Sequence, residues 1–152
     1  MIDACKANGV GLSIGYRLQH EPNTQAFRKI IREGTLGKVL GLDCAAGYRE
    51  GRTTHWKQNR DLGGGVIYDM GVYSIQGARL GAGMEPVAVT SAKIWTERPE
   101  VYRDGLGEIV EAELEFPGGV TGKIKTSFAE NVNFLTIPVS YTHLRAHETV
   151  LD

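Results

Sequence analysis

Apolar and polar residues alternate along the second half of the chain, which predicts β-strands joined by a tight turn. Residues 108–116 place Val110, Ala112, Leu114 and Phe116 on one face and glutamates on the other. Residues 120–128 separate Val120, Gly122, Ile124, Thr126 and Phe128 from Thr121, Lys123 and Lys125, and the Pro-Gly-Gly stretch at 117–119 lies between the two segments. Residues 40–48 alternate in the same way, and residues 86–96 form a further strand candidate. The pattern therefore predicts a sheet in which these segments are half-buried strands.

Charged positions in the two strands around the Pro-Gly-Gly turn predict their register. A two-residue turn would set Glu113 opposite the apolar Ile124. A three-residue turn sets Glu113 opposite Lys123 instead. The same turn pairs Glu111 with Lys125, so that opposite charges face each other along the hairpin. We therefore expect the three-residue turn.

Apolar residues spaced three or four apart predict three helices, at residues 2–7, 22–34 and 65–80. Residues 10–16 are apolar enough for a buried strand, and residues 49–62 form a polar loop. Strands on both sides of a pair of helices are typical of an α+β fold. The predicted architecture is an open, mostly antiparallel sheet with helices on one face.

Length and charge narrow the class of protein. The chain has 152 residues and a net charge of -1, which predicts one domain of ordinary size without the strong field of a nucleic-acid or anionic-membrane binder. No apolar run approaches the roughly 18 residues of a membrane helix, and Met1 does not open a signal sequence. Cys5 and Cys44 are too far apart for a Cys-x-x-Cys motif, which favours small apolar side chains in a reducing compartment.

One glycine cluster has the outline of a dinucleotide-binding loop. Gly9 and Gly11 match G-x-G-x-x-G, but Ile14 stands where the third glycine belongs. Such a loop follows a strand and opens a helix, whereas here the helix comes first. The cluster is better interpreted as a helix cap that enters a strand.

A more promising pair is Asp69 and Tyr73, four residues apart in the predicted third helix. This spacing places a carboxylate and a phenol side by side, a pairing suited to acid–base chemistry. Three glycines at 63–65 precede the pair and would let a flat ligand approach the backbone. From spacing alone, an ordinary helix with a hydrogen-bonded Asp–Tyr pair remains the alternative.

Other candidates for binding lie near the predicted strand end and in the polar loop. Arg17 can bind carboxylate, phosphate or hydroxyl oxygens, and His20 supplies an imidazole. Trp56 and Lys57 add an aromatic plane and a cation. Each of these residues by itself also fits a solvated surface position.

A pair of histidines near the end of the chain offers two potential metal ligands. His143 and His147 are four residues apart, but the order is not H-E-x-x-H and no third ligand is evident. No metal site is predicted.

Together these segments resemble the Gfo/Idh/MocA oxidoreductase family, and within it the glucose–fructose oxidoreductase branch. The segments that carry the resemblance occur in order along residues 2–130: Gly15-Tyr16-Arg17, the helix from Pro22 with Gly34-Thr35-Leu36-Gly37-Lys38-Val39, Trp56-Lys57, Gly63-Gly64-Gly65 with Asp69 and Tyr73, and Gly83-Met84-Glu85-Pro86-Val87.

The resemblance implies an enzyme that transfers a hydride between NAD or NADP and a sugar or polyol carbinol. In such an enzyme Tyr73 would be the acid–base partner of the sugar hydroxyl, and Asp69 would orient that hydroxyl. A lysine beside the nicotinamide, which belongs to a segment before Met1, would supply the cation that lets a phenol transfer protons at neutral pH.

The resemblance also implies which residues contact the ligands. Arg17, His20 and Lys57 are expected to contact the substrate, and Tyr16 and Trp56 the cofactor. Family members are expected to form homo-oligomers through the open sheet. A small-molecule sugar or polyol is the expected partner, with neither nucleic acid nor membrane.

The family pattern divides the chain into three parts. Residues 1–16 are expected to be the remnant of an N-terminal Rossmann dinucleotide-binding domain, and residues 17–138 an incomplete α+β domain for substrate and dimer contacts. Residues 139–152 fit no family pattern and are interpreted as an artefactual tail. Such a fragment is expected to be inactive by itself, and the alternative is a non-catalytic binding or dimerisation module. A cytoplasmic location is favoured, and a periplasmic one stays open.

Overall fold

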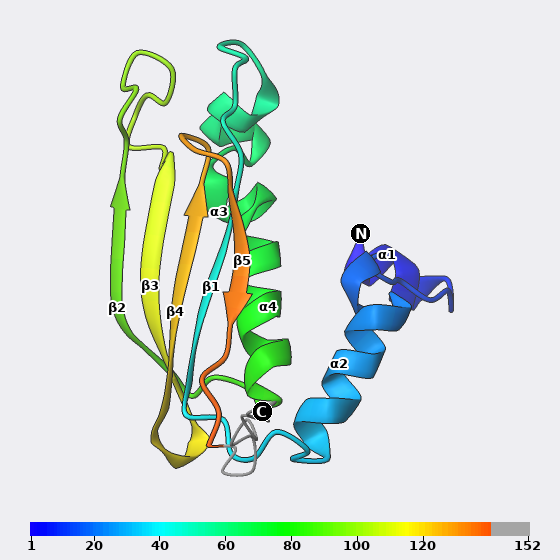
Figure 1. The fold of residues 1–152 in the computed structure, drawn as a ribbon. Coiled ribbons are helices and arrows are strands. Elements are labelled where there is room, and N and C mark those ends of the chain that lie inside the picture. Colours follow the sequence, from blue (N-terminus) through cyan, green and yellow to red (C-terminus); the bar gives the residue numbers. More distant parts are fainter. Residues whose placement is uncertain (141–152) are drawn as a thin grey trace.

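The computed structural model describes residues 1–140, and its core is a five-stranded sheet with one long helix packed on it (Figure 1). Its helices are α1 (Ile2–Ala7), α2 (Pro22–Arg32), α3 (Val66–Asp69) and α4 (Gly71–Ala82). Its strands are β1 (Gly41–Gly47), β2 (Ala88–Trp95), β3 (Ile109–Phe116), β4 (Val120–Ser127) and β5 (Val132–Thr136). Short 3₁₀ turns are η1 (Arg17–Gln19), η2 (Trp56–Gln58), η3 (Arg60–Leu62) and η4 (Pro117–Gly119).

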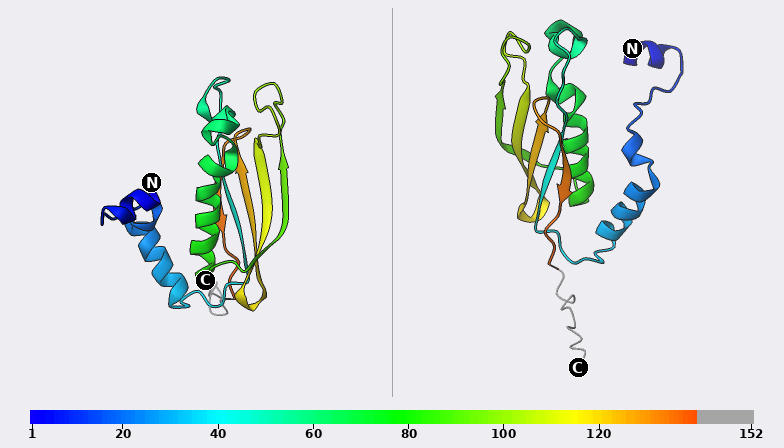
Figure 2. Two further views of the ribbon diagram at one scale, coloured as in Figure 1. Left: turned by 180° about the vertical axis from the view of Figure 1, so that it is seen from behind. Right: turned by 45° about the horizontal axis from the view of Figure 1, so that its top comes forward.

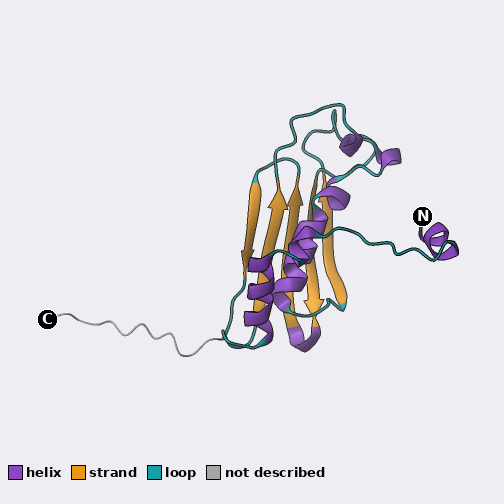
Figure 3. Cartoon of the chain, turned by 90° about the vertical axis from the view of Figure 1, so that its right-hand side faces the viewer, coloured by secondary structure: helices purple, strands orange, loops and turns teal. Residues whose placement is uncertain are grey.

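The strands are arranged in the order β2-β3-β4-β1-β5, and every pair is antiparallel except the parallel pair β1–β4. Helix α4 lies along one face of the sheet, while no helix of the described residues covers the other face (Figure 3). The predicted α+β architecture, with an open and mostly antiparallel sheet, is confirmed.

The predicted hairpin register is confirmed as well. Glu113 lies opposite Lys123 and Glu111 opposite Lys125 across β3 and β4. Within the turn Gly118 adopts a φ of 77°, a conformation that glycine reaches without steric cost. The turn residue and the cross-strand charges therefore favour the same register.

Small residues allow α4 to pack closely on the sheet. A side chain at Gly77 would come within 2.5 Å of the Cys44 sulfur, so only glycine permits this approach. Ala78 and Ala82 are buried against a cluster of apolar residues from the strands: Leu42, Leu114, Phe116, Val120 and Ile124. The same close packing places the first turns of α4 beside the end of β1.

Residues 10–16 do not form the predicted strand. They are an extended segment without strand pairing, which Figure 2 shows away from the sheet in the blue part of the ribbon. Val10, Leu12 and Ile14 are 57%, 48% and 72% exposed. A buried strand needs neighbouring strands on which to pair and pack, and the described residues provide none at this position.

Two further elements differ from the predictions. The predicted helix at 65–80 is divided at Met70 into α3 and α4, and α4 continues to Ala82. Strand β5 was not predicted, because only Asn133 interrupts its apolar residues and the alternation is too short to recognise. Its pairing with β1 places β1 in the interior of the sheet.

A buried ion pair holds the 97–108 loop against the end of the sheet. The Glu108 carboxylate is fully buried and accepts hydrogen bonds from the backbone N–H groups of Glu97 and Arg98. The Arg98 guanidinium donates to that carboxylate at 2.5 Å and to the carbonyl oxygens of Glu50 and Phe128 at 2.7 and 2.8 Å. Arg98 thus joins the loop, the end of β4 and the segment after β1.

Removing this guanidinium is expected to destabilise the domain. The substitution Arg98→Met leaves a buried carboxylate without its counter-ion, which should lower the free energy of unfolding by about 3 kcal/mol. Urea denaturation measures the change. The control is Lys123→Met, whose ion pair with Glu113 is exposed and spans 4.0 Å, and which should cost less than about 1 kcal/mol. Equal losses in the two variants would contradict the assigned role of Arg98.

Candidate active site

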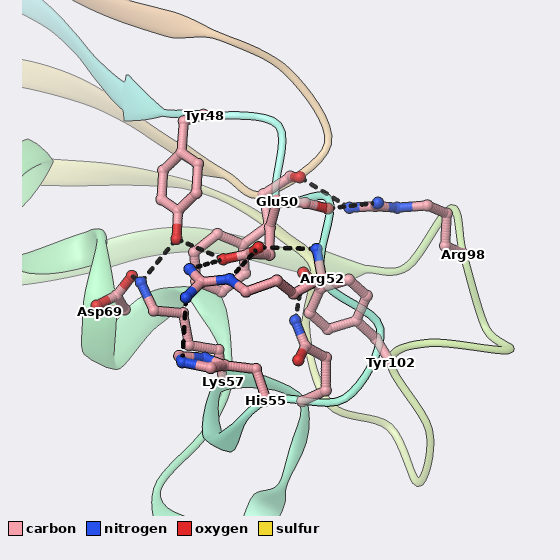
Figure 4. A network of polar contacts seen from close by, with 10 residues as sticks. Tyr48, Glu50, Arg52, His55, Lys57, Asp69, Arg98 and Tyr102 are labelled. Atoms are coloured by element: carbon pink, nitrogen blue, oxygen red, sulfur yellow. Dashed lines mark hydrogen bonds and ion pairs between the residues drawn. The ribbon is translucent and has the colours of Figure 1, made fainter.

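A network of polar side chains lies where β1 meets the loop before α3 (Figure 4). The Lys57 Nζ donates a hydrogen bond to the Asp69 carboxylate at 2.5 Å and another to the Tyr48 hydroxyl at 2.6 Å. The side chains of Lys57 and Asp69 are only 13% and 20% exposed. The strand end, the loop and α3 therefore each contribute one member of a shielded triad.

Aromatic rings surround the Lys57 ammonium group. Its Nζ lies 5.1 Å from the ring centre of Tyr48 and 5.5 Å from those of Trp56 and Phe128, within the range of cation–π attraction. Burial alone would lower the pKa of Lys57, but its hydrogen bonds to Asp69 and Tyr48 raise the pKa above the usual lysine value. Lys57 is therefore a fixed cation at neutral pH.

Glu50 extends the network toward the surface. Its buried carboxylate accepts hydrogen bonds from the Tyr48 hydroxyl at 2.8 Å and from the backbone and guanidinium of Arg52 at 2.6–2.9 Å. The hydrogen bonds from Arg52 outweigh burial and lower the pKa of Glu50 to about 2. Arg52 in turn lies 3.2 Å from a ring nitrogen of His55. Hydrogen bonds thus run from Asp69 to the half-exposed Arg52.

A cavity of about 580 Å³ opens between α2, α4 and the strands β1 and β5. Tyr73, on the first turn of α4, lines it from one side, and Arg17, on η1, lines it from the other. Cys44 and Met70 contribute to its wall, and burial raises the pKa of the Cys44 thiol to about 11. The cavity therefore contains one phenol and one guanidinium on a largely apolar wall.

The structure separates the predicted site residues into two groups. Asp69 and Lys57 are bonded together in the network, with the Trp56 ring beside them, whereas Tyr73 and Arg17 share the cavity. Asp69 ends α3 and Tyr73 lies in α4, and their side chains form no hydrogen bond with each other among the described residues.

The remaining two predicted residues lie outside both groups. His20 is exposed at the end of η1, and Tyr16 is 41% exposed just before η1. Neither lines the cavity that contains Tyr73. Their predicted contacts with substrate and cofactor stay predictions.

Two of the three glycines at 63–65, Gly64 and Gly65, serve close packing around their own loop. A Cβ atom on Gly64 would lie 2.6–2.7 Å from the backbone oxygens of Trp56, Lys57 and Asn59. Gly65 has a φ of 105°, and its N–H donates to the Lys57 carbonyl at 2.9 Å. The chain itself therefore occupies the space at Gly64, whereas Gly63 has no atom within 4 Å of its Cβ position, and the approach of a flat ligand to this stretch stays a prediction.

Sequence reasoning missed Tyr48, Glu50 and Arg52 as members of the site. One signal was present, because the alternation of β1 places Tyr48 on the face that α4 covers, and Glu50 follows two residues later. The residue pattern did not reveal that the loop before α3 folds back onto this strand end.

Residues 1–140 contain neither a metal-binding cluster nor a membrane-spanning helix. In that part of the chain, His, Cys, Asp and Glu side chains form no cluster of three that could bind a metal. None of its helices is both long enough and apolar enough to span a bilayer. The candidate pair His143 and His147, and most of the tail at 139–152, lie outside the described residues.

Comparison with known proteins identifies the family. Residues 24–144 match the family model for the GFO/IDH/MocA C-terminal domain. The chain belongs to the Gfo/Idh/MocA family. The resemblance seen in the sequence is thereby confirmed, and the sheet with α4 is the fold of this C-terminal domain.

Several of the relatives of the chain are oxidoreductases of sugars or diols. The chain is 34% identical in sequence to aldose–aldose oxidoreductase from Caulobacter crescentus, whose structure was solved in complex with glycerol. The two structures match with a TM-score of 0.82, and the match covers 91% of this chain and 41% of that one. Mouse trans-1,2-dihydrobenzene-1,2-diol dehydrogenase is 26% identical over 87% of this chain and 38% of its own length. The NADP(+) D-xylose 1-dehydrogenase of Haloarcula marismortui is 26% identical over 79% of this chain and 34% of its own length. The chain thus spans well under half of each relative.

The ionised state of Glu50 is expected to make stability depend on pH. Because the folded pKa of about 2 lies below the ordinary value of 4.5, Glu50 stabilises the fold above about pH 4.5 and loses this contribution as the pH falls toward 2. Urea unfolding between pH 2.5 and 6 should show a steeper loss for the wild type than for Glu50→Gln. The control variant Glu113→Gln, at an exposed position, should follow the wild type, and identical curves for all three would contradict this account.

Proposed function

We propose that this domain forms the substrate side of an NAD(P)-dependent oxidoreductase acting on a carbinol of a sugar or polyol. The observation that carries the proposal is the placement of Tyr73 in a cavity that Arg17 also lines, on the helix directly after the Lys57-bound Asp69. The sugar and diol oxidoreductases among the relatives support the substrate class. A volume of about 580 Å³ is within the usual range for a small-molecule site.

Tyr73 is the proposed proton donor and acceptor for the substrate hydroxyl. Oxidation of a carbinol removes a hydride from carbon and a proton from oxygen, so a group at the oxygen must take up that proton. Tyr73 is 36% exposed and lines the cavity, where a hydroxyl can reach its oxygen. Arg17, which lines the same cavity, would donate hydrogen bonds to other oxygens of the sugar.

Asp69 is the proposed orienting group, and Lys57 holds it in place. With the Asp69 carboxylate bound to a fixed ammonium at 2.5 Å, its second oxygen has a defined direction in which to accept a hydrogen bond from substrate. Lys57 was expected to contact the substrate itself. Its bonds to Asp69 and Tyr48 and its aromatic surroundings favour a positioning role instead.

The nicotinamide cofactor would supply the hydride acceptor or donor. The glycine-rich segments of the described residues do not form a loop for its pyrophosphate, since the chain itself fills the space at Gly64 and residues 9–15 form no loop that opens a helix. We therefore assign the cofactor's pyrophosphate to no residue of this chain. The exposed rings of Tyr16 and Trp56 remain proposed contacts for the nicotinamide.

The substitution Tyr73→Phe tests this proposal in a full-length polypeptide that joins this domain to a dinucleotide-binding domain. Loss of the phenolic oxygen should lower kcat by about 10²- to 10⁴-fold while the Kd for NADPH is unchanged. Steady-state assays with aldoses and inositols, and quenching of tryptophan fluorescence by NADPH, give the two quantities. The matched control is Tyr68→Phe, since Tyr68 on α3 is 73% exposed. Unchanged turnover in Tyr73→Phe would remove Tyr73 from the mechanism.

We also propose that the uncovered sheet face joins copies of the domain. That face carries alternating charges, with Lys93, Glu111 and Lys125 in one row across three strands. Beside this row Phe134 of β5 is 44% exposed, and a groove of about 560 Å³ runs between them. Charges of both signs around an exposed aromatic ring suit a self-complementary contact.

Analytical ultracentrifugation tests the sheet contact directly. Phe134→Lys should weaken dimerisation at least tenfold, because it places a charge in the apolar part of the contact. Leu62→Lys, at a 64% exposed position on η3, should leave the dimer unchanged. A monomeric wild type at 100 μM, or equal effects of both variants, would overturn the proposal.

A further inference from the structure

A second cavity, of about 280 Å³, lies between α2 and α4 and is lined by three arginines. Arg28 and Arg32 are one turn apart on α2, and Arg79 faces them from the last turn of α4. Against these three cations the cavity wall has one carboxylate, Glu85, which leaves a net charge of +2. This cavity is distinct from the one that contains Tyr73.

Three hydrogen bonds orient Arg79 at the cavity wall. Its Nε and Nη2 donate to the two carboxylate oxygens of Glu85 at 2.6 Å each, and its Nη1 donates to the side-chain oxygen Oε1 of Gln76 at 2.9 Å. Glu85 is thereby neutralised by its own partner. The charge left over comes from Arg28 and Arg32, which form no ion pair with any of the residues 1–140.

Gln76 adds a donor that lacks a partner within the described chain. Gln76 is only 8% exposed, and its side-chain oxygen accepts a hydrogen bond from Arg79. Its amide nitrogen makes no hydrogen bond to any of the residues 1–140, although Gln76 lines the cavity. This nitrogen is not among the buried side-chain atoms without a partner, so it reaches the solvent-filled cavity and can donate to a ligand there.

We propose that this cavity binds a phosphate group, as inorganic phosphate or as the phosphate of a sugar monoester. Two guanidinium groups without carboxylate partners and one amide N–H₂ are all donors, and a phosphate supplies acceptor oxygens for each of them. Arginine forks bind phosphate bidentately, which an array of lysines would not do. The inference does not rest on the proposed oxidoreductase activity, since neither Tyr73 nor Asp69 takes part.

The 152-residue chain tests the site by isothermal titration with inorganic phosphate and with glucose 6-phosphate, at constant ionic strength set by NaCl. The wild type should bind phosphate with a Kd below 1 mM, and Arg28→Ala/Arg32→Ala should weaken it at least tenfold. Tighter binding of glucose 6-phosphate would identify a monoester as the ligand, and equal binding would identify the free anion. The matched control is Lys29→Ala, an exposed cation on the same helix that pairs with Glu33, which should bind as the wild type does.

A second pair of variants guards against loss of folding. Arg28→Lys/Arg32→Lys keeps the charge and removes the forks, so phosphate should bind three- to tenfold more weakly. Gln76→Leu, which removes the amide donor, should also weaken binding, and neither variant should lose the far-UV circular dichroism of the wild type. Absence of saturable heat up to 10 mM phosphate, or equal affinity in wild type and Arg28→Ala/Arg32→Ala, would overturn the proposal.

Discussion

The candidate active site depends on the buried carboxylate of Glu50. The carboxylate oxygens accept hydrogen bonds from Arg52 and Tyr48. The backbone of Glu50 adds two more, because its carbonyl oxygen accepts from Arg98 and its N–H donates to the Phe128 carbonyl oxygen at 2.9 Å. Through Tyr48 the same carboxylate fixes Lys57, and through Lys57 it fixes Asp69 at the end of α3. A buried carboxylate is tolerated only when it is fully hydrogen-bonded, so the geometry of every group in this network is set together.

The sheet makes this arrangement possible because the parallel strands β1 and β4 finish at the same end of the sheet. The parallel pairing of β1 with β4 brings the residues after Gly47 next to those after Ser127, and the loop that contains Glu108 and Arg98 closes over both. Charged groups can then be desolvated at a strand end, because one apolar cluster fills the space under α4 and a second packs α3 and the 97–108 loop against the strand ends. The site therefore lies where backbone and loop hydrogen bonds are most interdependent.

Local sequence patterns were sufficient to predict the pairing of β3 with β4. Alternation and cross-strand charge placed Glu111 opposite Lys125 because neighbouring strands decide such a register. The contact between Lys57 and Asp69 could not be predicted in the same way, because it requires η2 to fold back onto α3 over Gly64. The strand expected at residues 10–16 failed for a related reason, since an apolar segment pairs only when other strands lie beside it.

Helix α4 connects the two cavities, and α2 is the element that closes both. Tyr73, Gln76 and Arg79 are spaced three residues apart on α4, so their side chains follow one another along neighbouring sides of the helix at intervals of about 4.5 Å. Leu80 contributes to the walls of both cavities. No residue of α2 is fully buried, so its own packing against α4 adds little to its stability. A ligand that binds only when α2 and α4 are in contact stabilises that contact by RT ln(1 + c/Kd), where c is the concentration of free ligand. Because α2 lines both cavities, occupation of the arginine-lined cavity would then also favour the closed shape of the Tyr73 cavity.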